Sequence, residues 1–392
     1  MVSGFAWRLA LFFGATFLIT GVKVTYMPVW LDWRGLSGAE IGLIGAAPLF
    51  ARIIAPPVVA LFTDRRGDPR TSVIALAWAS LVVMAGLPVA GGFWALLALA
   101  LLLAVVSTAI MPLVETIAMD GVARHGLDYG RMRLWGSITF IVASFVAGVA
   151  VTRWGAGAVV WLMVAASAAT ALAAHLLPGA EVGAARRGAA GEASAGPPIR
   201  MVQLLRNRGF VLFLVSVGAT QAAHAVFYVF GVLHWQRQGI TPVEASLLWS
   251  VGVIAEIALF AVSALAVQRA SALGLVLAGA AAALVRWTAM AFDPPFALLL
   301  ALQAMHGLTF GAAHLGAVHL IGQLVPREAA ATAQALYASV TSGIAMGLAT
   351  LASGWLYPAL GGRAYLAMAV LGAVGLVAGM LLFRVRGTAA LR

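Results

Sequence analysis

Six charged residues of this sequence lie within, or at the edge of, stretches that are otherwise apolar and long enough to cross a lipid bilayer. They are Lys23, Arg52, Glu115, Arg133, Glu256 and Arg286. A charge at the centre of a bilayer costs roughly 3 kcal/mol on insertion scales, so charged residues there are rare and usually face a water-filled cavity. We therefore expect the six charges to act on a polar ligand or a proton inside a membrane.

The composition also predicts a membrane protein. Of the 392 residues, 63% are hydrophobic and 9% are charged, whereas about 25% are charged in a typical globular protein. The sequence has no Cys, which excludes disulfides and thiolate metal sites. The formal net charge of +11 could indicate nucleic-acid binding, but the Arg residues lie in short clusters between apolar runs. That distribution is typical of cytoplasmic loops of membrane proteins, so we predict no binding of nucleic acid.

Twelve apolar runs of about 20 residues, the length of a transmembrane helix, can be drawn along the chain. Their approximate limits are 7–31, 39–62, 71–90, 93–119, 131–152, 156–177, 209–235, 243–267, 272–291, 295–324, 331–357 and 364–384. The first run is too long for a signal peptide, so we expect it to remain as the first span.

One interruption between the runs differs from the others. Residues 179–208 are rich in Gly, Ala and Pro and contain five Arg, a composition that predicts a flexible polar linker. The linker separates six spans from six spans. We therefore predict an all-α membrane protein with two six-helix halves, residues 1–178 and 209–392, joined by a cytoplasmic linker.

The distribution of Arg predicts the orientation in the membrane. If both termini are cytoplasmic, the cytoplasmic segments contain sixteen Arg and the outer loops contain four. Cytoplasmic loops carry an excess of Lys and Arg, so this is the expected orientation. It requires an even number of spans, which agrees with twelve.

Two halves of six spans with a basic central linker resemble the major facilitator superfamily of transporters, in which substrate binds near the middle of the membrane. In the loop after the second span, Asp64, Arg65 and Gly67 match the superfamily's loop signature, although Ala60 replaces its first Gly and Asp68 replaces an Arg. The resemblance implies a gating role for Asp64, Arg65 and Gly67. The alternative is a solvated turn that only ends the helix.

Further segments resemble the phenylpropionate permease branch of the superfamily and, more distantly, lactose permease and the other oligosaccharide–proton symporters. They are residues 112–115, 127–137, 221–225, 249–256, 285–287 and 302–307, in order along nearly the whole chain. We expect a multi-pass protein of a bacterial cytoplasmic (inner) membrane that is monomeric and needs no cofactor.

Glu115 and Arg133 are eighteen residues apart, as are the Glu of span 4 and the Arg of span 5 that hold substrate in the lactose-type symporters. The resemblance implies that both contact substrate, and that Phe140, seven residues after Arg133, stacks on it. Opposite charges also make each other's burial tolerable. The alternative is therefore a structural ion pair that only joins spans 4 and 5.

Glu256, Arg286 and His306 correspond to the Glu of span 8, the Arg of span 9 and the His of span 10 in those symporters. Arg286 and His306 are twenty residues apart, as are the Arg and the His of the family. The resemblance implies proton coupling by these three residues. In the family, the carboxylate that carries the proton lies three residues after the His. Thr309 occupies that position here and cannot carry a proton at physiological pH. The candidates that remain are Glu256, Glu115 or a histidine.

Four histidines, His224, His306, His314 and His319, fall in spans 7 and 10. The His side chain titrates nearest to neutrality, and we expect only His224 and His306 to take part in function. A lone His in a span is more often a hydrogen-bonded packing residue. No carboxylate lies beside these histidines at the spacing of metal ligands, so we predict no metal site.

Four other side chains are predicted to contact substrate in the interior of the spans. They are Phe140 of span 5, Gln221 and Tyr228 of span 7 and Trp249 of span 8. The aromatic members could form a pocket for a ring. The alternative for each is packing, which is the usual role of buried aromatic residues.

The sign of the buried charges indicates the class of substrate. Lys23 lies midway along span 1 and Arg52 midway along span 2. With the Arg of spans 5 and 9, they balance or outnumber the few buried acids. A fixed cation offsets the desolvation of a carboxylate, so we expect an anionic substrate that Lys23 and Arg52 help to bind. Alternatively, Lys23 pairs with Glu115 or with a helix carbonyl.

The sequence therefore predicts a secondary active transporter that takes up a small organic anion with protons by alternating access. An aromatic monocarboxylate, similar to phenylpropionate, fits best. The alternatives are a proton symporter of a neutral sugar or nucleoside, or an efflux antiporter, although the Gly-Pro signature of antiporters is missing from span 5. We do not predict an enzyme, because the sequence contains neither His-Glu-x-x-His nor Gly-x-Ser-x-Gly.

Overall fold

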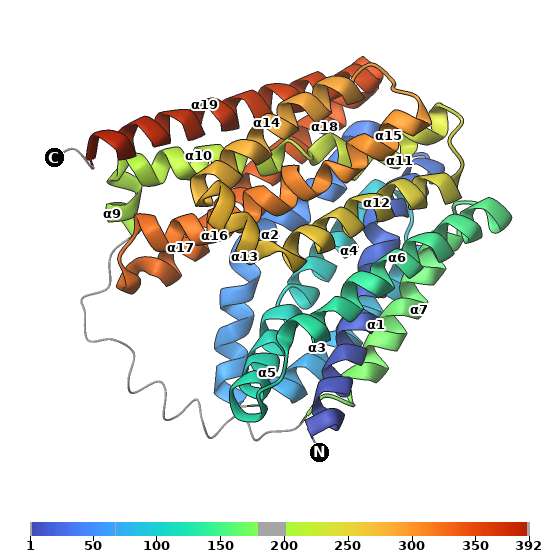
Figure 1. The fold of residues 1–392 in the computed structure, drawn as a ribbon. Helices are drawn as coiled ribbons and strands as arrows, with labels where there is room; N and C mark the ends of the chain where they lie inside the picture. The colour runs from blue at the N-terminus through green and yellow to red at the C-terminus, as the bar shows by residue number, and fades with distance from the viewer. Residues whose placement is uncertain (1, 67, 179–200, 390–392) are drawn as a thin grey trace. The chain divides into compact units, whose positions relative to one another are not determined.

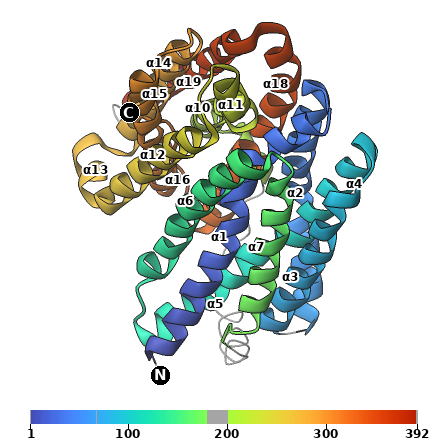
Figure 2. The same cartoon turned by 90° about the vertical axis from the view of Figure 1, so that its right-hand side faces the viewer.

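The computed structural model describes residues 2–66, 68–178 and 201–389, and these residues form helices and short connections without a β-strand. The chain divides into two compact units, Met1–Ala193 with Ile240–Ser246 and Ser194–Gly239 with Leu247–Arg392. The helices are labelled along the chain in Figure 1 and Figure 2. We call the two groups unit 1 and unit 2.

Unit 1 contains the spans that precede the predicted linker. Its helices are α1 Val2–Trp33, α2 Gly38–Arg66, α3 Pro69–Gly86 with the short η1 Leu87–Val89, α4 Gly92–Ser107, α5 Ile110–His125, α6 Tyr129–Trp154 and α7 Ala158–Ala174. α4 and α5 follow one another within a single apolar stretch, Gly92–His125. The described helices therefore make six spans.

Unit 2 contains the remaining spans, several of which are interrupted. Its helices are α9 Met201–Arg206, α10 Arg208–Ala222, α11 Ala225–Arg237, α12 Pro242–Ala261 (from Leu247 on), α13 Ser263–Ala270, α14 Ala272–Met290, α15 Phe296–Ala304, η2 Gly307–Ala312, α16 Ala313–Leu324, η3 Arg327–Ala329, α17 Ala330–Ala338, η4 Ser339–Ala345, α18 Met346–Leu360, η5 Gly361–Ala364 and α19 Tyr365–Ala389. Among them, η2 and η4 are π-helical.

The predicted number of spans agrees with these helices. Nine stretches of the described residues are long and apolar enough to cross a membrane. One of the nine, Arg327–Val385, contains both the α17–η4–α18 span and α19, and α2 and the shorter α7 complete the twelve predicted runs. The prediction of an all-α membrane protein with twelve transmembrane helices is confirmed.

Polar side chains determine where several helices begin. The Asp68 carboxylate accepts two backbone N–H groups at the start of α3, and Pro69 occupies the first helical position, where a fixed φ suits a helix. Asp128 caps α6 by accepting one backbone N–H, that of Arg131. Before α12, the Thr241 N–H donates to the Glu244 carboxylate at 2.8 Å and the Glu244 N–H donates to the Thr241 hydroxyl at 3.3 Å, a reciprocal capping box.

Within unit 1, α1 packs along α6 and α7. Small residues let two helix backbones approach closely in a membrane, and Gly21 has this role on α1. A Cβ atom at Gly21 would lie 2.5 Å from the carbonyl oxygen of Phe140 on α6. The packing fixes the helix that carries Lys23 against the helix that carries Arg133.

Within unit 2, α14 packs against α16 and α19, and α19 packs against α10 (Figure 1). A Cβ atom at Gly316 of α16 would lie 2.5 Å from the carbonyl oxygen of Ala272, and one at Gly372 of α19 would lie 2.8 Å from the backbone nitrogen of Leu284. Glycine on two sides therefore brings neighbouring backbones against α14, the helix that carries Arg286.

Two spans of unit 2 depart from α-helical geometry at a histidine. His224 lies in the turn between α10 and α11, and His306 immediately precedes the π-helix η2. Short π-helical segments within α-helices are found frequently at functional sites. Both histidines belong to one polar cluster around Arg286 of α14.

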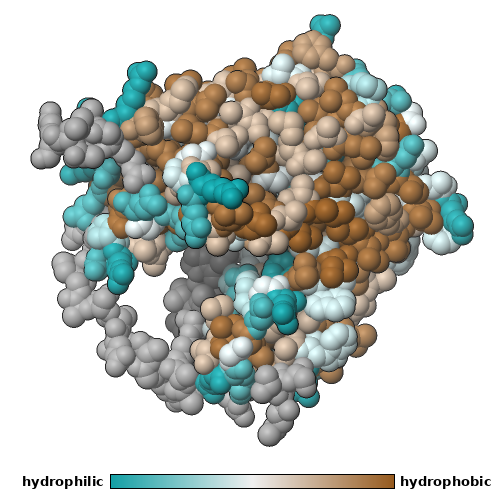
Figure 3. All heavy atoms as spheres, viewed as in Figure 1, coloured by the Kyte–Doolittle hydropathy of each residue, from teal (hydrophilic) through white to brown (hydrophobic). Residues whose placement is uncertain are grey.

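Apolar side chains cover much of the molecular face drawn in Figure 3. Many large apolar residues are highly exposed, among them Val89 at 82%, Trp94 at 77% and Val370 at 62%. A soluble protein rarely exposes apolar surface so extensively. Lipid, rather than water, is the medium that this surface fits.

Candidate substrate and proton site

Arg286 is the centre of a buried polar cluster in unit 2. Its side chain is fully buried, and its guanidinium donates from Nη1 to the Thr309 hydroxyl at 2.9 Å and from Nη2 to the Gln303 carbonyl oxygen at 2.8 Å. Nη1 also lies 3.3 Å from Nδ1 of His306. We call Gln303, His306 and Thr309 the Arg286 bracket. None of the three is an acid, so neutral atoms hold this buried cation.

The nearest acid reaches the cluster through His306. Nε2 of His306 lies 3.8 Å from a carboxylate oxygen of Glu256 on α12. The Glu256 side chain is 26% exposed and that of His306 is 10% exposed. The predicted set of Glu256, Arg286 and His306 therefore comes together as a row, in which His306 lies between the acid and the cation.

His224 joins the same cluster from the turn between α10 and α11. Its Nε2 lies 3.0 Å from the Thr309 hydroxyl, and its Nδ1 lies 3.0 Å from the backbone carbonyl of Gln221. His224 is fully buried, and its ring centre is 5.4 Å from that of His306. Both predicted histidines therefore lie beside Arg286, and Thr309 connects His224 to it.

Aromatic rings enclose this cluster. The guanidinium carbon of Arg286 lies 4.4 Å from the ring centre of Trp287 and 5.1 Å from that of Phe227, within the range of cation–π attraction. Phe227 in turn stacks on Trp249, with ring centres 4.6 Å apart, and Tyr228 stacks on His224. Trp249 and Tyr228, which the sequence predicts as pocket residues, thus line one continuous group of rings.

Two of the side chains that position Arg286 are not predicted from the sequence. Thr309 is interpreted there only as the position of a missing acid, and Gln303 has no predicted role. A signal for Gln303 exists, because it precedes His306 by three residues and therefore lies on the same face of a helix.

In unit 1, Tyr129 connects the predicted pair Glu115 and Arg133. The Tyr129 hydroxyl interacts electrostatically with both Glu115 and Arg133. Arg133 also lies over the ring of Phe17, with 4.0 Å from the guanidinium carbon to the ring centre. The structure thus brings the acid and the base of α5 and α6 to one tyrosine at the start of α6.

Lys23 and Arg52 come close together between α1 and α2. Their charges are near enough to repel each other. Lys23 is half-buried and Arg52 is exposed. Among the residues whose side chains the structure describes, no acid forms an ion pair with either cation. The alternative pairing of Lys23 with Glu115 is not seen in this structure.

Two other groups of predicted residues have different settings. Phe140 is buried at the crossing of α6 with α1, and Gln221 is buried, with its backbone carbonyl on His224. Of the predicted gate, Asp64 and Arg65 belong to the last turn of α2, whose side chains lie outside the described part of the chain, as does Gly67 altogether.

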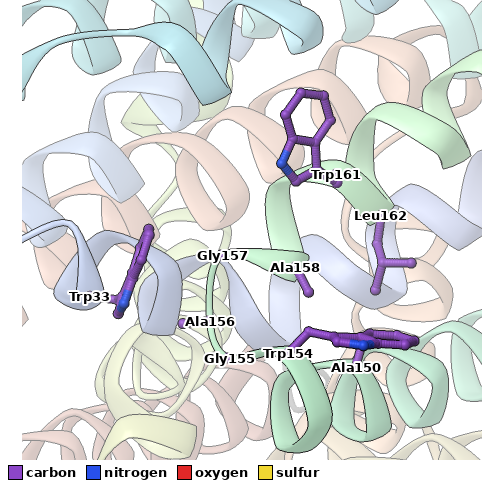
Figure 4. Close-up of a pocket in the computed structure, with 9 residues that line it drawn as sticks. All are labelled: Trp33, Ala150, Trp154, Gly155, Ala156, Gly157, Ala158, Trp161 and Leu162. Atoms are coloured by element: carbon purple, nitrogen blue, oxygen red, sulfur yellow. The ribbon is translucent and has the colours of Figure 1, made fainter.

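A groove of about 600 Å³ lies at the ends of α1, α6 and α7 (Figure 4). Its walls are the indoles of Trp33, Trp154 and Trp161, and small residues of the turn before α7 form its floor. The three indoles are 62–73% exposed. Tryptophans at span ends are typical anchors at the membrane surface, and the groove contains none of the charges described above.

The described residues contain no candidate metal site. They contain no group of three or more His, Asp or Glu that could hold a metal ion. What they contain is a membrane-embedded set of twelve spans with charged clusters inside each unit. This combination defines a secondary transporter of the major facilitator fold.

Comparison with known proteins agrees with that class. The MFS_1 like family matches residues 6–367. A protein of Escherichia coli (strain K12) named "probable 3-phenylpropionic acid transporter" is 30% identical over 369 residues, covering 92% of this chain and 94% of that protein. The maltose permease of Geobacillus stearothermophilus is 28% identical, covering 97% and 95%. The nucleoside transporter NupG has a similar structure, with a TM-score of 0.83 at 18% identity, covering 97% of this chain and 99% of that one.

The chain belongs to the MFS_1-like family. It is a multi-pass membrane transporter of the major facilitator superfamily and not an enzyme.

Proposed function

We propose that the protein takes up a small organic anion, of the aromatic monocarboxylate class, together with protons across a bacterial inner membrane. Both termini are cytoplasmic in this proposal, as the distribution of Arg predicts. The protein acts as a monomer that alternates between inward and outward access.

The observation that carries the proposal is the pair of cations Lys23 and Arg52. Two like charges close together inside a membrane protein repel each other, and the half-buried Lys23 has also lost part of its hydration. Lys23 is the single lysine of the chain, and the charge acting on it is that of Arg52. An anion bound between the two would offset both charges. A neutral ligand would leave them unbalanced.

The charges of unit 2 supply a reason for coupling to protons. When Glu256 is ionised, its charge balances that of Arg286 across His306. When Glu256 binds a proton, the buried Arg286 charge has no balance nearby, and binding of an anion becomes more favourable. Interactions in a low-dielectric interior are stronger than in water. Proton and anion therefore favour each other's binding, as coupled uptake requires.

The aromatic part of the proposed substrate has two supports. Phe227, Tyr228 and Trp249 present a continuous group of rings next to the charged cluster, and ring stacking adds about 0.5–1.5 kcal/mol per pair. The Escherichia coli relative is named for 3-phenylpropionic acid, whose carboxylate and ring match the cations and the rings. We therefore propose that Arg286 and this group of rings contact the substrate.

The remaining predicted residues have roles within the same proposal. Glu115, Tyr129 and Arg133 form unit 1's polar contact for substrate, with Phe140 beside them on α6. Gln221 and His224 support the site of unit 2. The loop residues Asp64, Arg65 and Gly67 act at the gate, as the superfamily signature implies.

A second candidate is a proton symporter of a neutral sugar or nucleoside. The balanced charges of Glu115 and Arg133 around the Tyr129 hydroxyl favour it, because hydroxyl-rich ligands need donors and acceptors side by side. The relative from Geobacillus stearothermophilus is named for maltose. The unbalanced pair of Lys23 and Arg52 does not suit such a ligand, so we place this candidate second.

Uptake of labelled 3-phenylpropionate into proteoliposomes, with the outside made acidic, tests the proposal. We expect accumulation that disappears when the pH gradient is removed, and competition by other aromatic acids but not by maltose or uridine. The variant Lys23→Gln should raise KM for 3-phenylpropionate about tenfold, which corresponds to about 1.4 kcal/mol of lost attraction. Arg131→Gln, which removes an exposed cation at the start of α6, should leave KM unchanged.

A second measurement uses the single lysine directly. An amine-reactive reagent should modify only Lys23 and the terminal amine, and peptide mass spectrometry counts each product. Bound 3-phenylpropionate should slow modification of Lys23 and not that of the terminus. Accumulation of maltose or uridine in place of aromatic acids, without protection of Lys23, would overturn the proposal in favour of the second candidate.

A further inference from the structure

We infer that Glu256 is the group that binds the coupled proton, and that the two histidines beside Arg286 remain neutral and serve to position it. The inference rests on the proton-coupled uptake proposed above. It answers the question that Thr309 raises by standing where lactose-type symporters carry an acid.

The tautomer of His306 follows from its neighbour. Nδ1 of His306 lies 3.3 Å from Nη1 of Arg286, and a guanidinium can only donate. Nδ1 therefore accepts and carries no proton, so the ring proton is on Nε2. Nε2 faces the Glu256 carboxylate at 3.8 Å. A second proton on Nδ1 would put two donors, both cationic, against each other.

The tautomer of His224 follows from a backbone carbonyl. Nδ1 of His224 lies 3.0 Å from the carbonyl oxygen of Gln221, which can only accept, so Nδ1 carries the ring proton. Nε2 then accepts the hydroxyl proton of Thr309 at 3.0 Å. The Thr309 oxygen in turn accepts from Arg286 at 2.9 Å. Both ring nitrogens of His224 and the Thr309 hydroxyl have hydrogen-bond partners when His224 is neutral. A second ring proton would break the bond to Thr309.

Thr309 therefore does different work from an acid at the same position. A carboxylate at this position would neutralise Arg286 directly, and it could bind and release a proton beside Arg286. The Thr309 hydroxyl has no charge to offer, and it connects Arg286 to a neutral histidine. Span 10 therefore has no acid that could bind the proton here. Glu256 of span 8 is the acid that remains next to the cluster.

Glu256 is suited to this role by its position. Its side chain is 26% exposed, so water can deliver a proton to it, whereas His224 and Arg286 are fully buried. Gly311 of η2 packs against α12 beside it, since a Cβ atom there would lie 2.9 Å from the Leu259 side chain and 3.7 Å from Cγ of Glu256. The Tyr228 hydroxyl is within electrostatic range of both Glu256 and Arg286.

The proton step is a simple transfer. A hydronium ion gives its proton to the Glu256 carboxylate, leaving water and a neutral carboxylic acid. The His306 ring then no longer lies beside a negative charge, and Arg286 attracts the substrate carboxylate. On the other side of the membrane the anion leaves, Glu256 returns the proton to water, and the initial balance of charge is restored.

Comparing two modes of transport by purified protein in proteoliposomes tests the inference. Accumulation of labelled 3-phenylpropionate under a pH gradient requires proton binding, while exchange of internal for external 3-phenylpropionate at equal pH does not. For one proton per anion, wild type should approach about tenfold accumulation per pH unit. Glu256→Gln, an analogue of the protonated acid, should equilibrate without accumulation yet still exchange. Glu256→Asp should keep part of the accumulation.

Variants of the histidines distinguish positioning from proton binding. In His306→Gln, the amide oxygen can accept from Arg286 and the amide nitrogen can donate toward Glu256, so we expect slower transport that still accumulates. His224→Gln should likewise slow transport without uncoupling it. His319→Gln is the matched control, because His319 is exposed on α16 and bonds only to its own helix, and it should behave as wild type.

Infrared difference spectra provide a readout that does not depend on transport. Lowering the pH should produce the carbonyl band of a protonated carboxylic acid in wild type and in His306→Gln, but a weaker band in Glu256→Gln. Accumulation by Glu256→Gln, or uncoupling by either histidine variant with exchange intact, would overturn the inference. Failure of wild type itself to accumulate would instead overturn the proposed function.

Discussion

Replacing Thr309 with Val is the sharpest test of how the buried cation of unit 2 is held. The substitution exchanges a hydroxyl for a methyl group of similar size, so it removes two hydrogen bonds without opening a cavity. One bond, at 2.9 Å, comes from the charged Arg286, and the other, at 3.0 Å, goes to His224. Thr309 is fully buried, so water does not replace either partner.

The magnitude follows from the two bonds. A hydrogen bond to a charged group contributes about 1.5–3 kcal/mol, and a buried acceptor left without a partner costs about 1–3 kcal/mol. Polar contacts within membranes are weaker on average, at about 0.6 kcal/mol and up to about 1.7 kcal/mol. We therefore expect Thr309→Val to lower the free energy of unfolding by about 2–4 kcal/mol.

Equilibrium unfolding in mixed micelles, followed by tryptophan fluorescence, measures this change. Thr309→Ser is the control, because it keeps the hydroxyl and removes one methyl group, at a cost of about 1 kcal/mol. A Val variant as stable as the Ser variant would show that the hydroxyl is not what holds Arg286. The inferred link from His224 through Thr309 to Arg286 would then lose its support.

Three further predictions concern packing, a strained turn and the cation pair. Gly316→Ala should destabilise unit 2 by about 1–3 kcal/mol through overpacking, since the new Cβ would meet the α14 backbone at 2.5 Å. Gly322→Ala on the same helix has open space and should increase the free energy of unfolding by about 0.5–1 kcal/mol. Equal midpoints of thermal unfolding for the two variants would contradict this. Asp293 has φ +51° and its carboxylate lies 2.8 Å from His234, so Asp293→Ala should cost about 2 kcal/mol from strain and lost contacts. Asp293→Asn, which tolerates this backbone and still accepts a hydrogen bond, should cost less than half of that in the same chemical denaturation experiment, and an equal loss would argue against strain. Lys23→Met should raise the melting temperature while weakening binding of 3-phenylpropionate, because it relieves repulsion in the empty protein; a lower melting temperature would mean that an acid balances Lys23.

Much of the candidate site is predictable because charge in a membrane is conspicuous. Each of the six charged residues stands out in an apolar run, and the resemblance to lactose-type symporters relates Glu115 to Arg133 and Arg286 to His306. The structure places Arg286 and His306 in contact and adds Tyr129 between Glu115 and Arg133. Tyr129 was not predicted, because a tyrosine at the start of a span is usually an anchor at the membrane surface.

The sequence by itself determines the class of protein, the twelve spans and the residues that are too costly to bury without a function. These properties depend on composition and on the length of apolar runs, which are local. Only the tertiary structure decides which side chains meet. The rotation of each helix about its axis, and the turns at His224 and before η2, bring Thr309, Gln303 and His224 to Arg286. Periodicity identifies the residues that share one face of a helix. It does not show which face of a neighbouring helix packs against them. That packing depends on small residues such as Gly316 and Gly372, where backbones approach closely.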